Sequence, residues 1–246
     1  MRLRPAEISL LTAMNYAKIP VFSKPRIALI ATGNELVLPG NKLSENKIVA
    51  SNSYGLSSML IAFGANPTIF PIAKDNVADV QKKLIKANGF DLILTIGGAS
   101  SGDYDVVKKA AIKSGLKLKF HKVAMKPGKP LLAGNFNNCP LVGLPGNPIS
   151  AMICCQIMVK PLIERMFGIS QDDFKLKLRA KLKKPLGKNG LREHYMRGVL
   201  STNKNYLTVC PLERQDSSLL SELSKANALI VRRPEAPAVR KNQFVD

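Results

Sequence analysis

The sequence contains no tryptophan, two histidines and four cysteines among 246 residues. The cysteines show no C-x-x-C spacing and the histidines lie far apart, so we expect neither a zinc site nor a disulfide framework. This use of cysteine favours a reducing cytoplasm. No apolar run approaches the roughly 20 residues of a membrane span, and the amino terminus lacks the pattern of a signal peptide. We therefore predict a cytoplasmic protein without a membrane partner.

Acidic residues are scarce, since 17 Asp and Glu stand against 37 Lys and Arg and give a net charge of +20. The excess is spread along the chain, because residues 1–159 carry 19 basic and 8 acidic side chains and residues 160–246 carry 18 and 9. No dense basic block and no RRM, KH or zinc-finger pattern is present. We therefore predict no nucleic-acid partner, and a solvated basic surface that attracts anionic substrates.

Short apolar runs alternate with helical patterns over the first two thirds of the chain. The runs predict strands at 26–31, 68–73, 91–96, 116–123, 131–133 and 141–144. The helical patterns predict helices at 54–63, 77–87, 106–113 and 149–166. Asn52 with Ser53 is expected to cap the first of these helices, and Asp75 or Asn76 the second. This alternation indicates an α/β fold, with a mostly parallel sheet and helices on both faces.

The pattern of apolar and polar residues changes along the chain and divides it into three predicted parts. Residues 1–24 would form a helix and a linker, left from a preceding domain that is truncated or missing. Residues 25–168 would form the α/β domain. Residues 172–246 would form a small β-rich domain, because 174–183 alternates apolar and basic residues as a half-buried strand does. Further strands at 193–200, 206–209 and 228–232 and a short helix at 217–223 would complete it.

A glycine loop, 97–105 (Gly-Gly-Ala-Ser-Ser-Gly-Asp-Tyr-Asp), joins a predicted strand to a predicted helix. Its glycines would let backbone N–H groups approach a bound anion closely. Asp103 and Asp105 beside such a cradle suggest a bridging divalent cation, because bare like charges would repel the ligand. The alternative is a tight turn with a capping Asp, and a lone glycine loop does not decide between the two.

Ligands of parallel sheets bind beyond the carboxyl ends of the strands. Glu35, Asp75, Asp103 and Asp105 each follow a strand or begin a helix, so we expect them at one edge of the sheet, where they could hold a hard cation. Asp75, taken alone, is more typical of a helix cap.

Two further loops have features of anion sites. Lys126 and Lys129 bracket Pro127 and Gly128, so a stiff backbone would present two ammonium groups to an oxyanion. The alternative is a solvent-facing connector. The segment 144–148 (Leu-Pro-Gly-Asn-Pro) opens a helix whose free N–H groups could bind an anion, although a plain helix start with an early proline explains it equally well.

Several segments together resemble the molybdopterin molybdenumtransferases, the family of MoeA and the gephyrin E domain. They are 25–37, 51–54, 97–105, 123–130 and 143–148, in the family's order and spacing, with C-terminal signatures at 195–198 and 214–218. The resemblance covers about residues 5–246. It implies a MogA-like α/β domain at 25–168 that binds molybdopterin, followed by the C-terminal β domain.

The resemblance implies that the enzyme inserts molybdate into adenylylated molybdopterin and releases AMP, with Mg²⁺ or another divalent cation. The implied catalytic residues are Glu35, Asp75, Asp103, Asp105, Lys126 and Lys129. Of these, Glu35, Asp103 and Asp105 are the implied metal ligands. The implied substrate-binding residues are Gly33, Ser53, Gly97, Gly98, Ser101, Gly102, Pro130, Pro145, Gly146, Asn147, Pro148, Arg197 and Ser217.

The chain also departs from the family. Asn34 stands where many relatives have Asp, and Asp216 replaces a usual Gly beside the implied anion site. Family members carry two more N-terminal domains, which complete the site across a dimer. We therefore expect a homodimer, a separate chain that supplies the missing domains, or an adenylyltransferase partner. The alternatives are a non-catalytic molybdopterin-binding module or half-enzyme and, less favoured, a molybdopterin adenylyltransferase.

Overall fold

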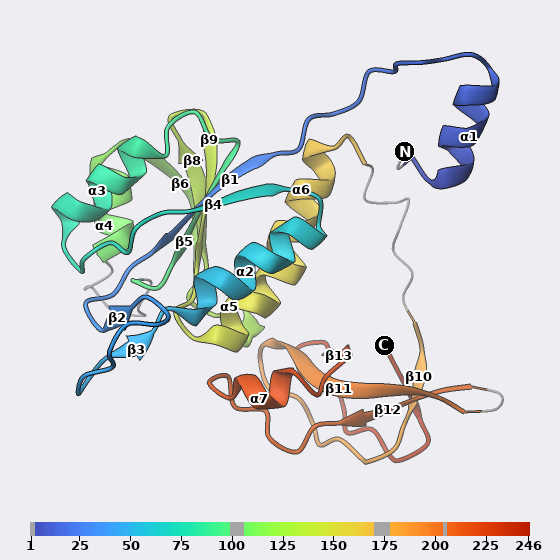
Figure 1. Ribbon diagram of the computed structural model, residues 1–246. Helices are drawn as coiled ribbons and strands as arrows, with labels where there is room; N and C mark the ends of the chain where they lie inside the picture. Colours follow the sequence, from blue (N-terminus) through green and yellow to red (C-terminus); the bar gives the residue numbers. More distant parts are fainter. Residues whose placement is uncertain (1–2, 99–105, 170–177, 204–205) are drawn as a thin grey trace.

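The computed structural model describes residues 3–98, 106–169, 178–203 and 206–246 (Figure 1). Within these ranges the first sheet has the order β4–β1–β5–β9–β8–β6. The pairs β4–β1, β1–β5 and β5–β9 are parallel, and β8 runs antiparallel to both neighbours. The strands are β1 (Arg26–Ala31), β4 (Asn66–Ile69), β5 (Leu92–Ile96), β6 (Leu116–His121), β8 (Leu132–Phe136) and β9 (Cys139–Leu144). The predicted α/β fold with a mostly parallel sheet is confirmed.

Helices cover both faces of this sheet, which explains why its central strands are apolar without alternation. In β1, Ile27 and Leu29 pack into the core on one face, and Ala28 and Ile30 pack into the core on the other. Figure 1 shows the two helical layers on opposite sides of the strands. One layer holds α2 (Ser51–Ala62), α5 (Pro148–Cys154) and α6 (Lys160–Met166), and the other holds α3 (Val77–Lys86) and α4 (Val106–Lys113).

One predicted helix cap is wrong, and the choice between two candidates for another is now made. Helix α2 begins at Ser51 after Ala50, without a side-chain cap, so Asn52 and Ser53 lie in its first turn and do not cap it. Helix α3 is capped by Asn76, whose side chain accepts the N–H of Asp79 at 2.8 Å. Asp75 is therefore left for another contact.

The long helix predicted at 149–166 is interrupted by a π-helical segment, η1 (Cys155–Val159), before α6. The cause lies at Pro161, which has no N–H to donate and whose ring would clash with the carbonyl four residues earlier; a wider turn relieves that clash. Cys154 and Cys155 are buried there, and burial raises the pKa of each thiol to about 12.

A second sheet forms the C-terminal region, with the order β13–β11–β12–β10–β14. Its strands are β10 (Ala180–Leu182), β11 (Glu193–Asn203), β12 (Tyr206–Pro211), β13 (Ala228–Arg232) and β14 (Phe244–Val245). The N–H of Val231 donates to the carbonyl of Asp246, which brings the edges at β13 and β14 together. Ala180 and Leu182 point into its core, as the predicted alternation requires, while residues 174–177 lie outside the described residues. Helix α7 (Leu220–Leu223) is shorter than the predicted 217–223.

A short strand joins the two regions. Strand β7 (Met125–Lys126) leaves the first region and pairs in parallel with β11, and the N–H of Glu193 donates to the carbonyl of Ala124 at 2.9 Å. Tyr195 of β11 packs against the core beneath α2 and α5. The C-terminal sheet is therefore attached to the layer that carries α5.

The remaining elements lie at the margins. Strands β2 (Leu36–Val37) and β3 (Ile48–Val49) form a small parallel pair beside the end of β1. Helix α1 (Pro5–Ala13) lies apart from the sheet, at the end of an extended segment (Figure 1). Among the helices of the described ranges, each is too short or too polar to cross a membrane. The domain boundaries stay a prediction.

Candidate functional site

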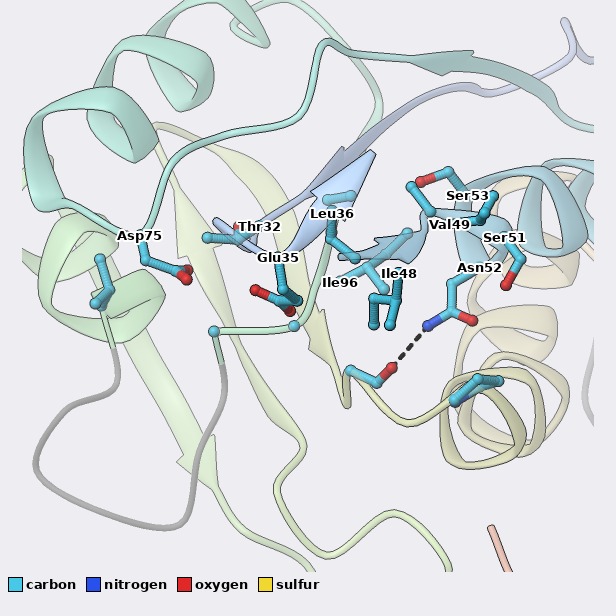
Figure 2. A pocket seen from close by; sticks show the side chains of 17 residues that line it. Thr32, Glu35, Leu36, Ile48, Val49, Ser51, Asn52, Ser53, Asp75 and Ile96 are labelled. Atoms are coloured by element: carbon cyan, nitrogen blue, oxygen red, sulfur yellow. Dashed lines mark hydrogen bonds between the residues drawn. The ribbon is translucent and has the colours of Figure 1, made fainter. Parts of the chain in front are cut away.

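A pocket of about 640 Å³ opens at the carboxyl ends of β1 and β5. Its walls come from the loops that follow β1, β4, β5 and β9 and from the first turn of α2. Figure 2 shows Asp75, Thr32 and Glu35 at one end, Ser51, Asn52 and Ser53 at the other, and apolar side chains between them. The lining residues are Ala31, Thr32, Glu35, Leu36, Ile48, Val49, Ala50, Ser51, Asn52, Ser53, Asp75, Ile96, Gly97, Gly98, Val106, Gly146 and Pro148.

The acidic end of the pocket is held by a reciprocal pair. The N–H of Asn34 donates to Asp75 Oδ2 at 3.0 Å, and the N–H of Asp75 donates to Asn34 Oδ1 at 3.1 Å. Lys47 also donates to the carbonyl of Asn34, at 2.6 Å. These contacts tie the loop after β1 to the loop after β4, so that the carboxylates of Glu35 and Asp75 face the same space (Figure 2).

The glycines that end β5 form the floor. Gly97 and Gly98 have φ of +81° and +65°, a conformation that residues other than glycine rarely adopt. A Cβ on Gly97 would lie 2.8 Å from the carbonyl oxygen of Thr32, and one on Gly98 would collide with Val107. The absence of side chains therefore lets the backbone approach both the neighbouring loop and a ligand.

The sequence did not predict that two polar atoms in the pocket walls belong to the site. Thr32 Oγ1 and Asn52 Oδ1 are buried and have no hydrogen-bond partner among the described residues. Asn52 uses its other amide atom, since Nδ2 donates to the carbonyl of Gly146 at 2.7 Å (Figure 2). Buried polar groups normally find partners, so each oxygen has unused hydrogen-bonding capacity in the pocket wall. Their positions in the sequence could have identified both residues as site candidates, because each lies in a segment that follows or faces a strand end.

The middle of the pocket is apolar. Leu36 and Ile96 form its inner wall, and Ile48 and Val49 of β3 remain 55% and 40% exposed at its mouth. An apolar wall between two polar ends suits a ligand with a flat ring and charged substituents.

A divalent cation fits the acidic end by donor type. Carboxylates from Glu35 and Asp75, together with the Thr32 hydroxyl, are the hard oxygen ligands that Mg²⁺ prefers. Among the described residues, no three His, Cys, Asp or Glu side chains cluster closely enough to hold a metal. Asp103 and Asp105, the other two implied metal ligands, lie outside the described residues.

The structure brings one group of the predicted residues together. Seven of them line the pocket: Glu35, Ser53, Asp75, Gly97, Gly98, Gly146 and Pro148. Gly33 lies directly behind, where a Cβ would come within 2.5 Å of Glu35 Oε1. Pro145 and Asn147 flank Gly146 on the same loop. Ser101 and Gly102, like Asp103 and Asp105, fall outside the described residues.

A second group of predicted residues lies outside the pocket. Lys126 and Lys129 are exposed on the segment that begins with β7, followed by Pro130. Arg197 of β11 is only 1% exposed, and its guanidinium donates to carbonyls of the loop that carries Ser217. Burial lowers the pKa of Arg197. Ser217 reaches the pocket indirectly, because its carbonyl accepts the N–H of Ile149 in α5 at 3.2 Å.

The Asp216 carboxylate in that loop accepts hydrogen bonds within its own turn. It accepts the N–H of Ser218 at 2.9 Å and the Ser218 hydroxyl at 2.8 Å. These hydrogen bonds lower the pKa of Asp216. The carboxylate therefore stabilises the loop that carries Ser217.

Comparison with known proteins gives consistent matches over both regions. Residues 28–165 match the model of the probable molybdopterin binding domain, and residues 179–246 match the MoeA C-terminal region (domain IV). The chain is 34% identical to a molybdopterin molybdenumtransferase of Nostoc sp. over 203 residues, which are 81% of this chain and 47% of that protein. It is 31% identical to one of Haemophilus influenzae over 250 residues, which are 99% of this chain and 61% of that protein.

The fold has a counterpart among solved structures. The crystal structure of the molybdopterin biosynthesis MoeA protein from Pyrococcus horikosii superposes with a TM-score of 0.84 at 27% identity, covering 100% of this chain and 59% of that one. The chain thus spans between 47% and 61% of the length of these relatives. Because the molybdopterin-binding model matches more than half of its residues, the chain belongs to the molybdopterin-binding domain family and carries the MoeA C-terminal region behind that domain.

Proposed function

We propose that the chain acts in molybdenum cofactor biosynthesis by inserting molybdate into adenylylated molybdopterin, with release of AMP. The observation that carries the proposal is the pocket itself, which joins two carboxylates, a glycine floor and an apolar wall. Its volume lies within the range usual for small-molecule sites. The names of the relatives support the same class of substrate.

In this proposal the acidic end handles the phosphates. Glu35 and Asp75, with Asp103 and Asp105, would hold Mg²⁺ or another divalent cation. Such a cation, when bound, supplies positive charge to the phosphate oxygens. The bare backbone at Gly97 lets a phosphate come close to the end of β5, as glycine-rich strand–helix turns do elsewhere.

The rest of the pocket would orient the substrate. The apolar wall of Leu36 and Ile48 would pack against a flat ring. Ser53 and Asn52 would hydrogen-bond its polar edge. We propose that Lys126 and Lys129, exposed ammonium groups outside the pocket, attract molybdate to the protein.

The test is the release of AMP from adenylylated molybdopterin by the purified chain under anaerobic conditions. We expect release that requires both molybdate and Mg²⁺, and that falls by about 10²- to 10³-fold in Glu35→Gln, the usual loss for one preorganised electrostatic contact. AMP release that ignores molybdate, or that survives in Glu35→Gln, would contradict the proposal.

A second candidate function rests on length. The chain spans 47% to 61% of its relatives, so it could be a non-catalytic molybdopterin-binding module or a half-enzyme that needs a separate chain. Adding a polypeptide that carries the relatives' remaining region, followed by gel filtration and the same AMP assay, separates the two. Activity that appears only in the mixed complex supports the half-enzyme. Gel filtration of the chain alone tests the proposed homodimer, and gel filtration with an added molybdopterin adenylyltransferase tests that proposed partner.

A further inference from the structure

We propose that Gln215 is a positioning residue, which together with Arg197 couples the C-terminal sheet to the pocket through the first turn of α5. The inference rests on the proposed function only for its ligand readout. The coupling itself is a matter of hydrogen bonds between the loop 212–218, strand β11 and helix α5.

Gln215 uses its whole side-chain amide to hold one point of β11. Its Oε1 accepts the N–H of Arg197 at 3.0 Å, and its Nε2 donates to the carbonyl of Arg197 at 2.9 Å. The same Nε2 donates to the carbonyl of Leu212 at 2.8 Å. Strand β12 has ended at Pro211, but the N–H of Leu212 still donates to the Arg197 carbonyl at 2.9 Å. The Gln215 amide completes this pairing, because it bridges the N–H of Arg197 and the carbonyl of Leu212. This arrangement needs a donor and an acceptor on one side chain.

Arg197 completes the attachment from the other direction. Its guanidinium donates to the carbonyls of Arg214 at 3.1 Å and Asp216 at 3.0 Å, the residues on either side of Gln215. The side chain is 1% exposed, so these bonds form away from water. A buried donor that loses its acceptor is costly, which makes this loop conformation strongly preferred.

The loop delivers one contact to the α/β domain. The carbonyl of Ser217 accepts the N–H of Ile149 at 3.2 Å. Ile149 lies in the first turn of α5, where backbone N–H groups lack partners inside the helix. The preceding residues, Gly146 and Pro148, line the pocket, and the carbonyl of Gly146 accepts the side chain of Asn52. Hydrogen-bonded contacts therefore connect β11 to the pocket wall.

Removing the Gln215 amide should free the loop, leave the Ile149 N–H without its acceptor and loosen the wall at Gly146. Ligand affinity should fall more than the turnover rate of bound substrate falls, because Gln215 touches neither substrate nor cation in this arrangement. A purely structural residue would lower stability without this local effect.

The chain offers a matched control on the same strand. The Asn227 amide accepts the N–H of Leu200 at 2.6 Å and donates to the carbonyl of Leu200 at 3.0 Å. The Asn227 side chain thus makes the same kind of reciprocal bond to β11 as Gln215. Its loop precedes β13, and the contacts of Asn227 stay within the C-terminal sheet.

The experiment measures amide hydrogen exchange at Ile149 by NMR in the full chain, for Gln215→Leu, Gln215→Glu and Asn227→Leu. We expect exchange at Ile149 to quicken by about tenfold in Gln215→Leu, the change for one lost hydrogen bond. Gln215→Glu keeps the acceptor for Arg197 and should give a smaller increase, and Asn227→Leu should give none. If Gln215→Leu does not fold, the exchange rate of Ile149 in Gln215→Glu is compared with the rate in Asn227→Leu, and only the former should be raised.

Equal exchange in the Gln215 and Asn227 variants would overturn the inference. The second readout is the dissociation constant of adenylylated molybdopterin, which should rise in Gln215→Leu and stay unchanged in Asn227→Leu. If the wild-type chain fails to bind this probe, the proposed function fails, while the exchange at Ile149 still decides whether Gln215 acts on α5.

Discussion

Asn34 and Asp75 each accept the backbone N–H of the other, at 3.0 and 3.1 Å, and so join the loops that follow two adjacent strands. The pair keeps Asp75 Oδ2 occupied by a structural hydrogen bond while the carboxylate still faces the pocket. A neutral Asn at position 34 can make this contact as well as an Asp could, because only its oxygen is used. Asn34 therefore makes this contact without adding a negative charge to the acidic end of the pocket.

Two substitutions separate the structural and the electrostatic role of Asp75. Asp75→Asn keeps an oxygen for the Asn34 N–H, so the free energy of unfolding should stay within about 0.5 kcal/mol of wild type. Asp75→Ala removes that acceptor and should lower it by about 1 kcal/mol. Both remove the charge, so Mg²⁺ should stabilise both variants less than wild type. Urea unfolding with and without Mg²⁺ checks this, and equal losses in the two variants without Mg²⁺ would count against it.

Alanine at Gly97 should be far worse than alanine at Gly89. Both glycines have a positive φ, +81° and +86°, but a Cβ at Gly89 meets nothing within 4 Å while one at Gly97 lies 2.8 Å from the Thr32 carbonyl. Gly89→Ala should lose about 1 kcal/mol from its backbone conformation alone. Gly97→Ala should lose about 1–3 kcal/mol more from overpacking and should also bind ligand weakly. Similar unfolding midpoints for the two variants would show that the close approach is absent.

Cys154 should matter for stability and not for activity. Its side chain is fully buried, and burial raises the pKa of the thiol to about 12. Cys154→Ala should lower the free energy of unfolding by about 1 kcal/mol through the lost packing, with ligand affinity unchanged. In the folded protein, thiol reagents at pH 8 should modify the partly exposed Cys210 well before Cys154. A variant with a normal melting temperature but reduced activity would refute this reading.

His194 should make the protein less stable in mild acid. Burial, and then the charges of Lys126, Arg192, Arg197 and Arg232, lower its pKa from 6.5 to about 4. The unfolded chain thus binds a proton that the folded chain refuses, so stability is fully present above pH 6.5 and is lost as the pH falls toward 4. Partial exposure keeps the effect below the roughly 1.4 kcal/mol per pH unit of one fully linked proton.

Urea unfolding at pH 7 and pH 5 measures this effect. The wild-type midpoint should fall between the two values, and the midpoint of His194→Gln should fall less. An equal fall in both proteins would mean that other groups carry the acid sensitivity.

Elements that are buried on both faces were predictable from the sequence, and contacts between distant loops were not. The ends of β1 and β5 could be predicted from their apolar runs, because the side chains of these strands enter a core. The choice between Asp75 and Asn76 as a helix cap needed the Asn34 loop in place. Arg197 belongs to the signature at 195–198, so it was predicted as a site residue. Its burial beneath the 212–218 loop could not be predicted, because it depends on the closure of the C-terminal sheet and not on the local sequence pattern.

The pocket was predictable in part for the same reason. Carboxyl ends of parallel strands meet at one edge, so Glu35, Gly97 and Gly146 converge as the topology requires. Asn52 was expected to cap α2, and its bond to the Gly146 carbonyl depends on two segments 94 residues apart. Lys126 lies on β7, whose position is set by pairing with β11 and not by the sheet that contains β1.

The most direct test of the central claim is an amide NMR titration of the full chain with adenylylated molybdopterin in the presence of Mg²⁺. The account predicts that the largest chemical-shift changes fall on Asn34, Glu35, Asn52, Gly97 and Gly146, which line or flank the pocket at the end of β1 and β5. Changes confined to the C-terminal sheet, with these five amides unmoved at saturating ligand, would contradict it.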